Sequence, residues 1–194
     1  MSQPEQPQLY IVTPEAVDHA FADTLAAVLD THPAACVRLD LATRDEDRIA
    51  RAADALREVT HARDVALVVT DRVALAERLG LDGVHLSVGG SVRDARKALG
   101  TDAIVGAHAG SSRHDGMTAG EAGADYIAFD ASAGHDLFAW WTEMIELPIV
   151  AEGALTQAAV RTLAPVTDFF AIGDEIWSAE NPAKALNTLL SSLG

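Results

Sequence analysis

Apolar residues in this chain fall into two alternating patterns. Short runs rich in β-branched and aromatic residues have the length and composition of buried strands. Between them lie longer stretches in which apolar residues recur at helical spacing, which predicts amphipathic helices. The predicted strands cover residues 9–13, 36–41, 65–70, 83–88, 103–108, 126–129, 148–152 and 168–173.

The predicted helices carry recognisable start signals. A serine, threonine or asparagine just before such a stretch can cap the helix by accepting a hydrogen bond from a free backbone N–H group. Two of these residues are followed by proline, which suits the first helical position. Another stands at capping-box spacing before a glutamate. The expected caps are Thr13, Thr43, Ser91, Thr156 and Asn181.

The order of these elements predicts the fold class. Strands that are apolar on both faces and separated by helices indicate a parallel sheet covered by helices. Eight such units predict an α/β protein, a single closed (β/α)8 or TIM barrel. The alternative is an open doubly wound sheet, but no GxGxxG motif follows the first run to support it. We expect a polar N-terminal tail at residues 1–8 and one barrel domain at residues 9–194.

The composition narrows the range of partners. The chain has 194 residues, 49% of them hydrophobic, and a net charge of −15 at pH 7. Such a surface repels nucleic acid and anionic lipid, so we expect neither as a partner. The single cysteine, Cys36, allows no intrachain disulfide, and the polar start MSQPEQPQ lacks the regions of a signal peptide. No apolar run approaches the length of a membrane span, and we expect a cytoplasmic protein.

A barrel of this kind carries its chemistry at the carboxyl ends of its strands. Arg38 and Asp40 lie two positions apart on one strand, so they point the same way and can form an ion pair. His108 is a candidate catalytic base, whereas His85 is expected to be a hydrogen-bonded barrel residue. The strand-end residues are Thr13, Arg38, Asp40, Thr70, Asp71, His85, Ser87, His108, Asp130, Glu152, Gly173 and Asp174.

Some of these residues also have a purely structural interpretation. Asp71, Glu152 and Asp174 can each cap the helix that follows them. Arg113, in the small-residue loop at 109–116, either holds an anion or is solvated.

Three stretches resemble a known family. They are TDRVALAERLGLDGVHL (70–86), EAGADYIAF (121–129) and PIVAEGAL (148–155). In order and spacing they are similar to segments of the thiamine-phosphate synthase and thiazole tautomerase family of (β/α)8 barrels. The resemblance implies a synthase that joins an aminopyrimidine diphosphate to a thiazole phosphate, with Mg²⁺ holding the pyrophosphate. It also makes a homodimer the expected state.

Carried over by position, the family's metal and pyrophosphate residues are incomplete. The resemblance assigns Asp71 to the metal, but Gly90 stands where the second metal carboxylate is expected. In the family's Gln-Leu-Arg-x-Lys pattern, Arg38 replaces the glutamine, Asp40 the arginine and Ala42 the lysine. Positive groups have been lost and acids gained.

The other family positions are also partly changed. Thr70 stands where the family has asparagine. Gly153 and Gly173 remain as the backbone of the thiazole-phosphate cradle, while Asp174 replaces a serine. After the sixth strand, Asp130 opens a loop that has lost the family's lysine.

Three hypotheses follow for the function. The first is a synthase-like protein of thiamine biosynthesis with lost or altered activity. In it, His108, Asp71 and Arg38 are catalytic candidates and Arg113 contacts the substrate. The second is a non-catalytic barrel that binds a cationic or amine-bearing ligand in an acidic mouth. The third is a tautomerase-like isomerase with His108 or His135 as the base. The mouth of the second hypothesis is formed by Asp40, Asp130, Glu152 and Asp174.

The adjacent tryptophans Trp140 and Trp141 bear on the oligomeric state. Two neighbours on one predicted helix cannot both face the same side. An exposed tryptophan would be a candidate subunit contact in a homodimer.

Overall fold

Eight parallel strands form a closed barrel in the computed structural model, which describes residues 6–193. Each strand pairs with the next along the chain, and β8 closes the ring by pairing with β1. The strands are β1 (Gln8–Val12), β2 (Ala34–Leu39), β3 (Ala66–Thr70), β4 (Gly83–Leu86), β5 (Ile104–His108), β6 (Tyr126–Asp130), β7 (Ile149–Glu152) and β8 (Phe169–Ile172). The predicted fold class is confirmed.

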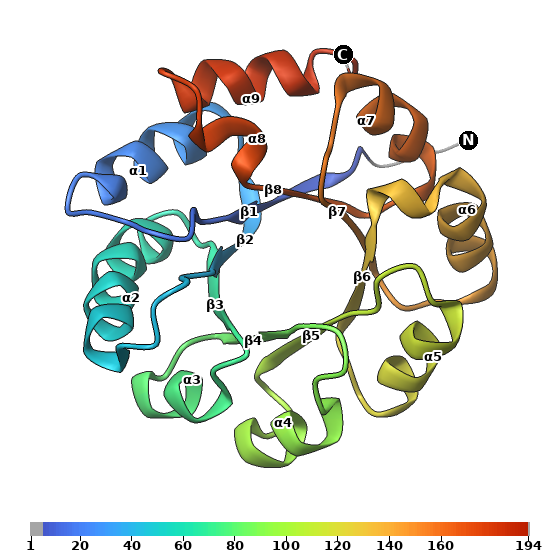
Figure 1. The fold of residues 1–194 in the computed structure, drawn as a ribbon, viewed down its shortest axis with the longest axis horizontal. Coiled ribbons are helices and arrows are strands. Elements are labelled where there is room, and N and C mark those ends of the chain that lie inside the picture. The colour runs from blue at the N-terminus through green and yellow to red at the C-terminus, as the bar shows by residue number, and fades with distance from the viewer. Residues whose placement is uncertain (1–5, 194) are drawn as a thin grey trace.

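Helices surround the barrel as an outer ring (Figure 1). The α-helices are α1 (Phe21–Thr31), α2 (Glu46–His61), α3 (Val73–Leu79), α4 (Val92–Leu99), α5 (Arg113–Glu121), α6 (His135–Met144), α7 (Gln157–Leu163), α8 (Asp174–Trp177) and α9 (Pro182–Leu190). Two 3₁₀ turns, η1 (Ala131–Ala133) and η2 (Ala164–Val166), complete the elements. None of the described helices has the length and apolar character needed to cross a membrane. Residues 1–5 of the expected polar tail lie outside the described residues, and β1 already begins at Gln8.

Alternation along the strands divides the core into two parts. One set of strand residues packs against the helices in the main hydrophobic cluster, and the alternate set fills the barrel interior. The interior contains Tyr10 and Tyr126, and Gly106 makes room for the second of these rings. A Cβ atom at Gly106 would lie only 2.0 Å from Tyr126 Cζ. Cys36 is buried in the same interior cluster.

Three of the five expected helix caps are confirmed. The side chains of Ser91, Thr156 and Asn181 accept hydrogen bonds from backbone N–H groups in the first turns of α4, α7 and α9.

The caps expected at Thr13 and Thr43 are wrong. The Thr13 hydroxyl accepts a hydrogen bond from Asp40 N at 3.0 Å, which ties the end of β1 to the end of β2. Helix α1 begins only at Phe21. Thr43 accepts from Asp45 N at 3.2 Å, and Asp45 itself caps α2.

Candidate active site

Polar side chains gather inside the barrel at the carboxyl ends of the strands. Arg38, His85, His108 and Glu152 come from β2, β4, β5 and β7. Arg38 and Glu152 stand two positions after Cys36 and Val150 of the interior cluster, so their side chains also face the interior, and both histidines lie next to Glu152. The carboxyl ends of the strands therefore bring together residues that are far apart in the sequence.

Arg38 and Glu152 form the central ion pair of this cluster. Arg38 Nη1 donates to Glu152 Oε2 at 3.1 Å, and Nη2 donates to Oε1. Arg38 is only 4% exposed. The distance from Arg38 Nη2 to Oδ2 of Asp40, the partner expected from the sequence, is longer at 3.6 Å. Burial raises the pKa of Glu152, but the hydrogen bond with His108 and the positive charge of Arg38 outweigh it and leave this pKa far below its ordinary value.

His108 lies between two carboxylates. Its Nε2 is 2.9 Å from Asp130 Oδ1, and its Nδ1 is 3.4 Å from Glu152 Oε2. The hydrogen bond with Glu152 raises the pKa of His108, and the effect of Asp130 adds to it, against partial burial. The partner that sequence analysis did not identify for this histidine is therefore a pair of acids.

His85 is buried beneath His108. Its Nδ1 lies 2.9 Å from the Tyr126 hydroxyl, which in turn lies 2.7 Å from the Tyr10 hydroxyl. Burial lowers the pKa of His85, helped by the charge of Arg38, so the imidazole is neutral near pH 7. Its Nε2 faces Glu152 Oε2 at 4.0 Å.

Asp71 and Gly90, the two positions that correspond to the family's magnesium ligands, do not form a site for that ion. Asp71 Oδ1 accepts a hydrogen bond from Ser87 N at 2.8 Å, so this carboxylate holds the start of the loop after β4. It does not cap α3, whose N-cap is Arg72. A Cβ at Gly90 would lie 2.8 Å from Leu86 Cβ, so this loop conformation does not admit an aspartate there. One carboxylate engaged by the backbone is a poor donor set for a hard cation that prefers several oxygen ligands.

Arg113 and His135 lie apart from the cluster. Arg113 is exposed at the start of α5, stacks 4.6 Å above the Trp140 ring and donates to Asp136 O at 3.1 Å. His135 is also exposed, and its contact is the neighbouring Asp136 at 3.7 Å. Trp141 is fully buried, whereas Trp140 is half-buried under the arginine.

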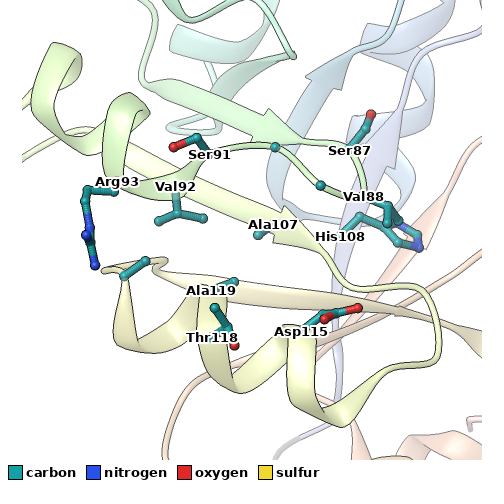
Figure 2. Close-up of a pocket in the computed structure, with 13 residues that line it drawn as sticks. Ser87, Val88, Ser91, Val92, Arg93, Ala107, His108, Asp115, Thr118 and Ala119 are labelled. Atoms are coloured by element: carbon teal, nitrogen blue, oxygen red, sulfur yellow. The ribbon is translucent and has the colours of Figure 1, made fainter.

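Two cavities lie at this end of the barrel. The larger, about 480 Å³, lies between α4 and α5 beneath the loop 87–91, and His108 stands at its inner end, away from Arg93 (Figure 2). The smaller, about 210 Å³, is the mouth itself. The mouth holds most of the charged groups, so we take it as the candidate site. Its lining includes Arg38, Asp40, Glu152, Gly153, Gly173 and Asp174. The structure thus brings these predicted residues together.

Glu175 is a site residue that sequence analysis missed. It lines the mouth from α8, and its carboxylate accepts hydrogen bonds from Gly173 N at 2.9 Å and from Leu155 N at 3.1 Å. In many barrels, the backbone after strands seven and eight binds a phosphate group. Here a carboxylate of the chain itself occupies two of those N–H groups. An acid at the first turn of a short helix after a glycine was the available signal.

Comparison with known proteins identifies the relatives. Residues 9–173 match the family model described as thiamine monophosphate synthase. The chain belongs to this family. A thiamine-phosphate synthase of Rhodospirillum centenum is 42% identical over 92% of this chain and 94% of its own length. One of Erythrobacter litoralis is 37% identical over 94% of each chain.

Solved structures of other proteins have the same fold as this chain. Thiamine phosphate pyrophosphorylase from Pyrococcus furiosus superposes with a TM-score of 0.82 at 22% identity, covering 96% of this chain and 95% of its own. A structure described as native KDPGal superposes with a TM-score of 0.75 at 16% identity, covering 99% of this chain and 96% of its own. The family resemblance expected from the sequence is confirmed.

Proposed function

We propose that this protein acts in thiamine biosynthesis as a synthase-type barrel, and that its mouth binds a thiamine precursor. The observation that carries the proposal is the family match over residues 9–173, with a synthase relative 42% identical over nearly the full length of both chains. The proposal keeps the cytoplasmic location, the single domain at residues 9–194 and the homodimer expected from the sequence. Light scattering after size-exclusion chromatography measures the last of these.

The pyrophosphate-displacing step is weakened in this proposal. Departure of pyrophosphate needs positive charge at the leaving group. Here Arg38 is bound to Glu152, and the chain's two lysines, Lys97 and Lys184, lie in α4 and α9. Because Asp71 and Gly90 do not form the family's magnesium site, no step is assigned to that ion.

An assay with both family substrates and added Mg²⁺ tests this function. We expect thiamine phosphate to form at no more than about a hundredth of the rate of the Pyrococcus furiosus protein, the loss typical when a group that stabilises developing charge is removed. Calorimetry should show binding of at least one precursor. If folded protein binds neither precursor and forms no product, the proposal is wrong.

The acidic mouth favours a second candidate, the binding of a cationic or amine-bearing ligand. Glu15, Asp40, Asp174 and Glu175 line the mouth, and its arginine is already paired. A phosphate placed there meets like charge, and Glu175 already holds two backbone donors. This hypothesis predicts that the protein binds thiamine more tightly than thiamine phosphate, which calorimetry measures. The reverse order would favour the synthase-type phosphate site.

A further inference from the structure

Three potential metal ligands converge beside the ion pair in the barrel mouth. They are His85 Nε2, His108 Nδ1 and Glu152 Oε2, which all lie within 4.8 Å of one another. The glutamate oxygen is 3.4 Å from the His108 nitrogen and 4.0 Å from the His85 nitrogen. Ligand atoms bonded to a tetrahedral metal at about 2.0–2.1 Å are a little over 3 Å apart, so small side-chain shifts suffice.

Each imidazole is held by a hydrogen bond at its other nitrogen. His108 Nε2 pairs with Asp130 Oδ1 at 2.9 Å, and His85 Nδ1 pairs with the Tyr126 hydroxyl at 2.9 Å. In metal sites the second ring nitrogen usually donates to such an oxygen, which leaves the first nitrogen free to bind the metal. The carboxylate–histidine pairing at Asp130 is of this kind. Both rings are therefore held at one nitrogen, while the other nitrogen lies within 4.8 Å of the glutamate oxygen.

The charge around this point favours a dication. With both imidazoles neutral, as metal binding requires, Arg38 contributes one positive charge, and Asp40, Asp130 and Glu152 contribute three negative charges. Arg38 binds both oxygens of Glu152, but a carboxylate oxygen has a second lone pair. Oε2 can therefore face the two imidazoles while the guanidinium holds the carboxylate in place. A divalent ion would offset the excess negative charge of the cluster.

We infer that His85, His108 and Glu152 bind a divalent transition-metal ion of the Zn²⁺ class. Two imidazoles and one carboxylate suit zinc and its neighbours, whereas Mg²⁺ prefers an all-oxygen shell. Three protein ligands are the number found in catalytic zinc sites, which keep a further position for water or substrate. The Thr70 hydroxyl, on the strand beside His85, is buried without a hydrogen-bond partner in the described part of the chain. A metal-bound water is a suitable partner for such a hydroxyl.

The test uses the metal alone and needs no thiamine precursor, so its outcome is independent of the proposed function. Full-length protein is treated with EDTA, dialysed and titrated with Co²⁺, whose visible d–d absorption reports coordination by nitrogen and oxygen. Zn²⁺ binding is then measured by calorimetry and by displacement of Co²⁺. We expect one ion per chain, and no displacement of Co²⁺ by excess Mg²⁺.

Variants assign the ion to these residues. His108→Asn removes a ligand that is not fully buried, and should weaken Zn²⁺ binding by more than about 100-fold, beyond the cost of losing an outer-shell partner. Asp130→Asn removes only that outer-shell partner and should weaken binding by about 10–100-fold. His135→Asn, at an exposed histidine outside the cluster, is the matched control and should bind as the wild type does. Because His85 is buried, the test does not depend on a variant there.

Two outcomes would overturn the inference. One is the absence of Co²⁺ absorption and of Zn²⁺ heat in folded wild-type protein. The other is equal Zn²⁺ affinity in His108→Asn and the wild type, which would place the ion on surface histidines.

Discussion

The buried ion pair between Arg38 and Glu152 leads to a quantitative prediction about stability. Glu152→Gln removes the negative charge and leaves a guanidinium that is 4% exposed. Breaking such a pair typically costs about 3–5 kcal/mol, because the remaining charge is desolvated without compensation. We expect the lower end, about 3 kcal/mol, since Asp40 lies 3.6 Å from the same guanidinium and the Glu152 side chain keeps 17% exposure.

Urea unfolding followed by tryptophan fluorescence measures this loss, with EDTA present so that metal binding makes no contribution. A loss of about 3 kcal/mol corresponds to a fall in Tm of roughly 6–12 °C for a chain of this size. The control is Asp30→Asn, which breaks a similar pair with Arg63 on the surface at 2.9 Å. Because the Asp30 side chain is exposed and solvent screens the pair, its loss should cost far less stability than the loss of the Glu152 charge.

The double variant Arg38→Met with Glu152→Leu separates charge burial from packing. Replacing both partners with apolar residues should recover most of the stability lost in Glu152→Gln. The reasoning is refuted if Glu152→Gln costs no more than Asp30→Asn, because the mouth would then be solvated enough to accommodate a free guanidinium.

Three further predictions address other parts of the barrel. Glu175→Gln should raise the affinity for thiazole phosphate about tenfold or more, because a neutral amide holds the two backbone N–H groups less strongly than a carboxylate; calorimetry measures this, with Glu15→Gln as the control. Burial raises the pKa of the Cys36 thiol to about 12, so native protein should resist iodoacetamide at neutral pH while urea-unfolded protein reacts. Because the thiol ionises more easily in the unfolded chain, the raised pKa stabilises the fold fully below the ordinary thiol pKa, and this contribution is lost as the pH rises toward about 12. The unfolding free energy of the wild type minus that of Cys36→Ala should therefore shrink over that pH range. Gly106→Ala should lower the unfolding free energy by about 1–3 kcal/mol or more, because its methyl group collides with Tyr126, and thermal unfolding would show no change if the ring can move aside.

The fold could be predicted because its signals are repeated and local. Each strand is an apolar run and most helices carry their own cap, so errors at single positions do not change the architecture. The two wrong caps have a tertiary cause in one case and a local one in the other. The Thr13 hydroxyl bonds to β2, which periodicity around residue 13 does not encode, whereas Thr43 loses the cap to Asp45, two residues further on.

The site could be predicted only as a set of strand ends. The rule that places strand ends together gave Arg38, His108, Asp130 and Glu152 as neighbours, but not which of them pair. Arg38 makes its closest ion pair with Glu152, which is 114 residues away on a strand several places around the ring, and not with Asp40, which is only two residues away in the sequence. That choice depends on side-chain lengths across the barrel interior, which the alternation of residues does not specify.

The Glu175 carboxylate also sets the concentration at which a ligand of this barrel can be detected. Because it belongs to the same chain, it is a tethered competitor whose effective concentration at the backbone of Gly173 and Leu155 is on the order of millimolar or higher. A free anion must displace this carboxylate, so the apparent affinity of the anion falls in proportion to the effective concentration of the carboxylate. A ligand screen run at micromolar concentration would therefore find no anion, even if the underlying backbone site has kept its shape.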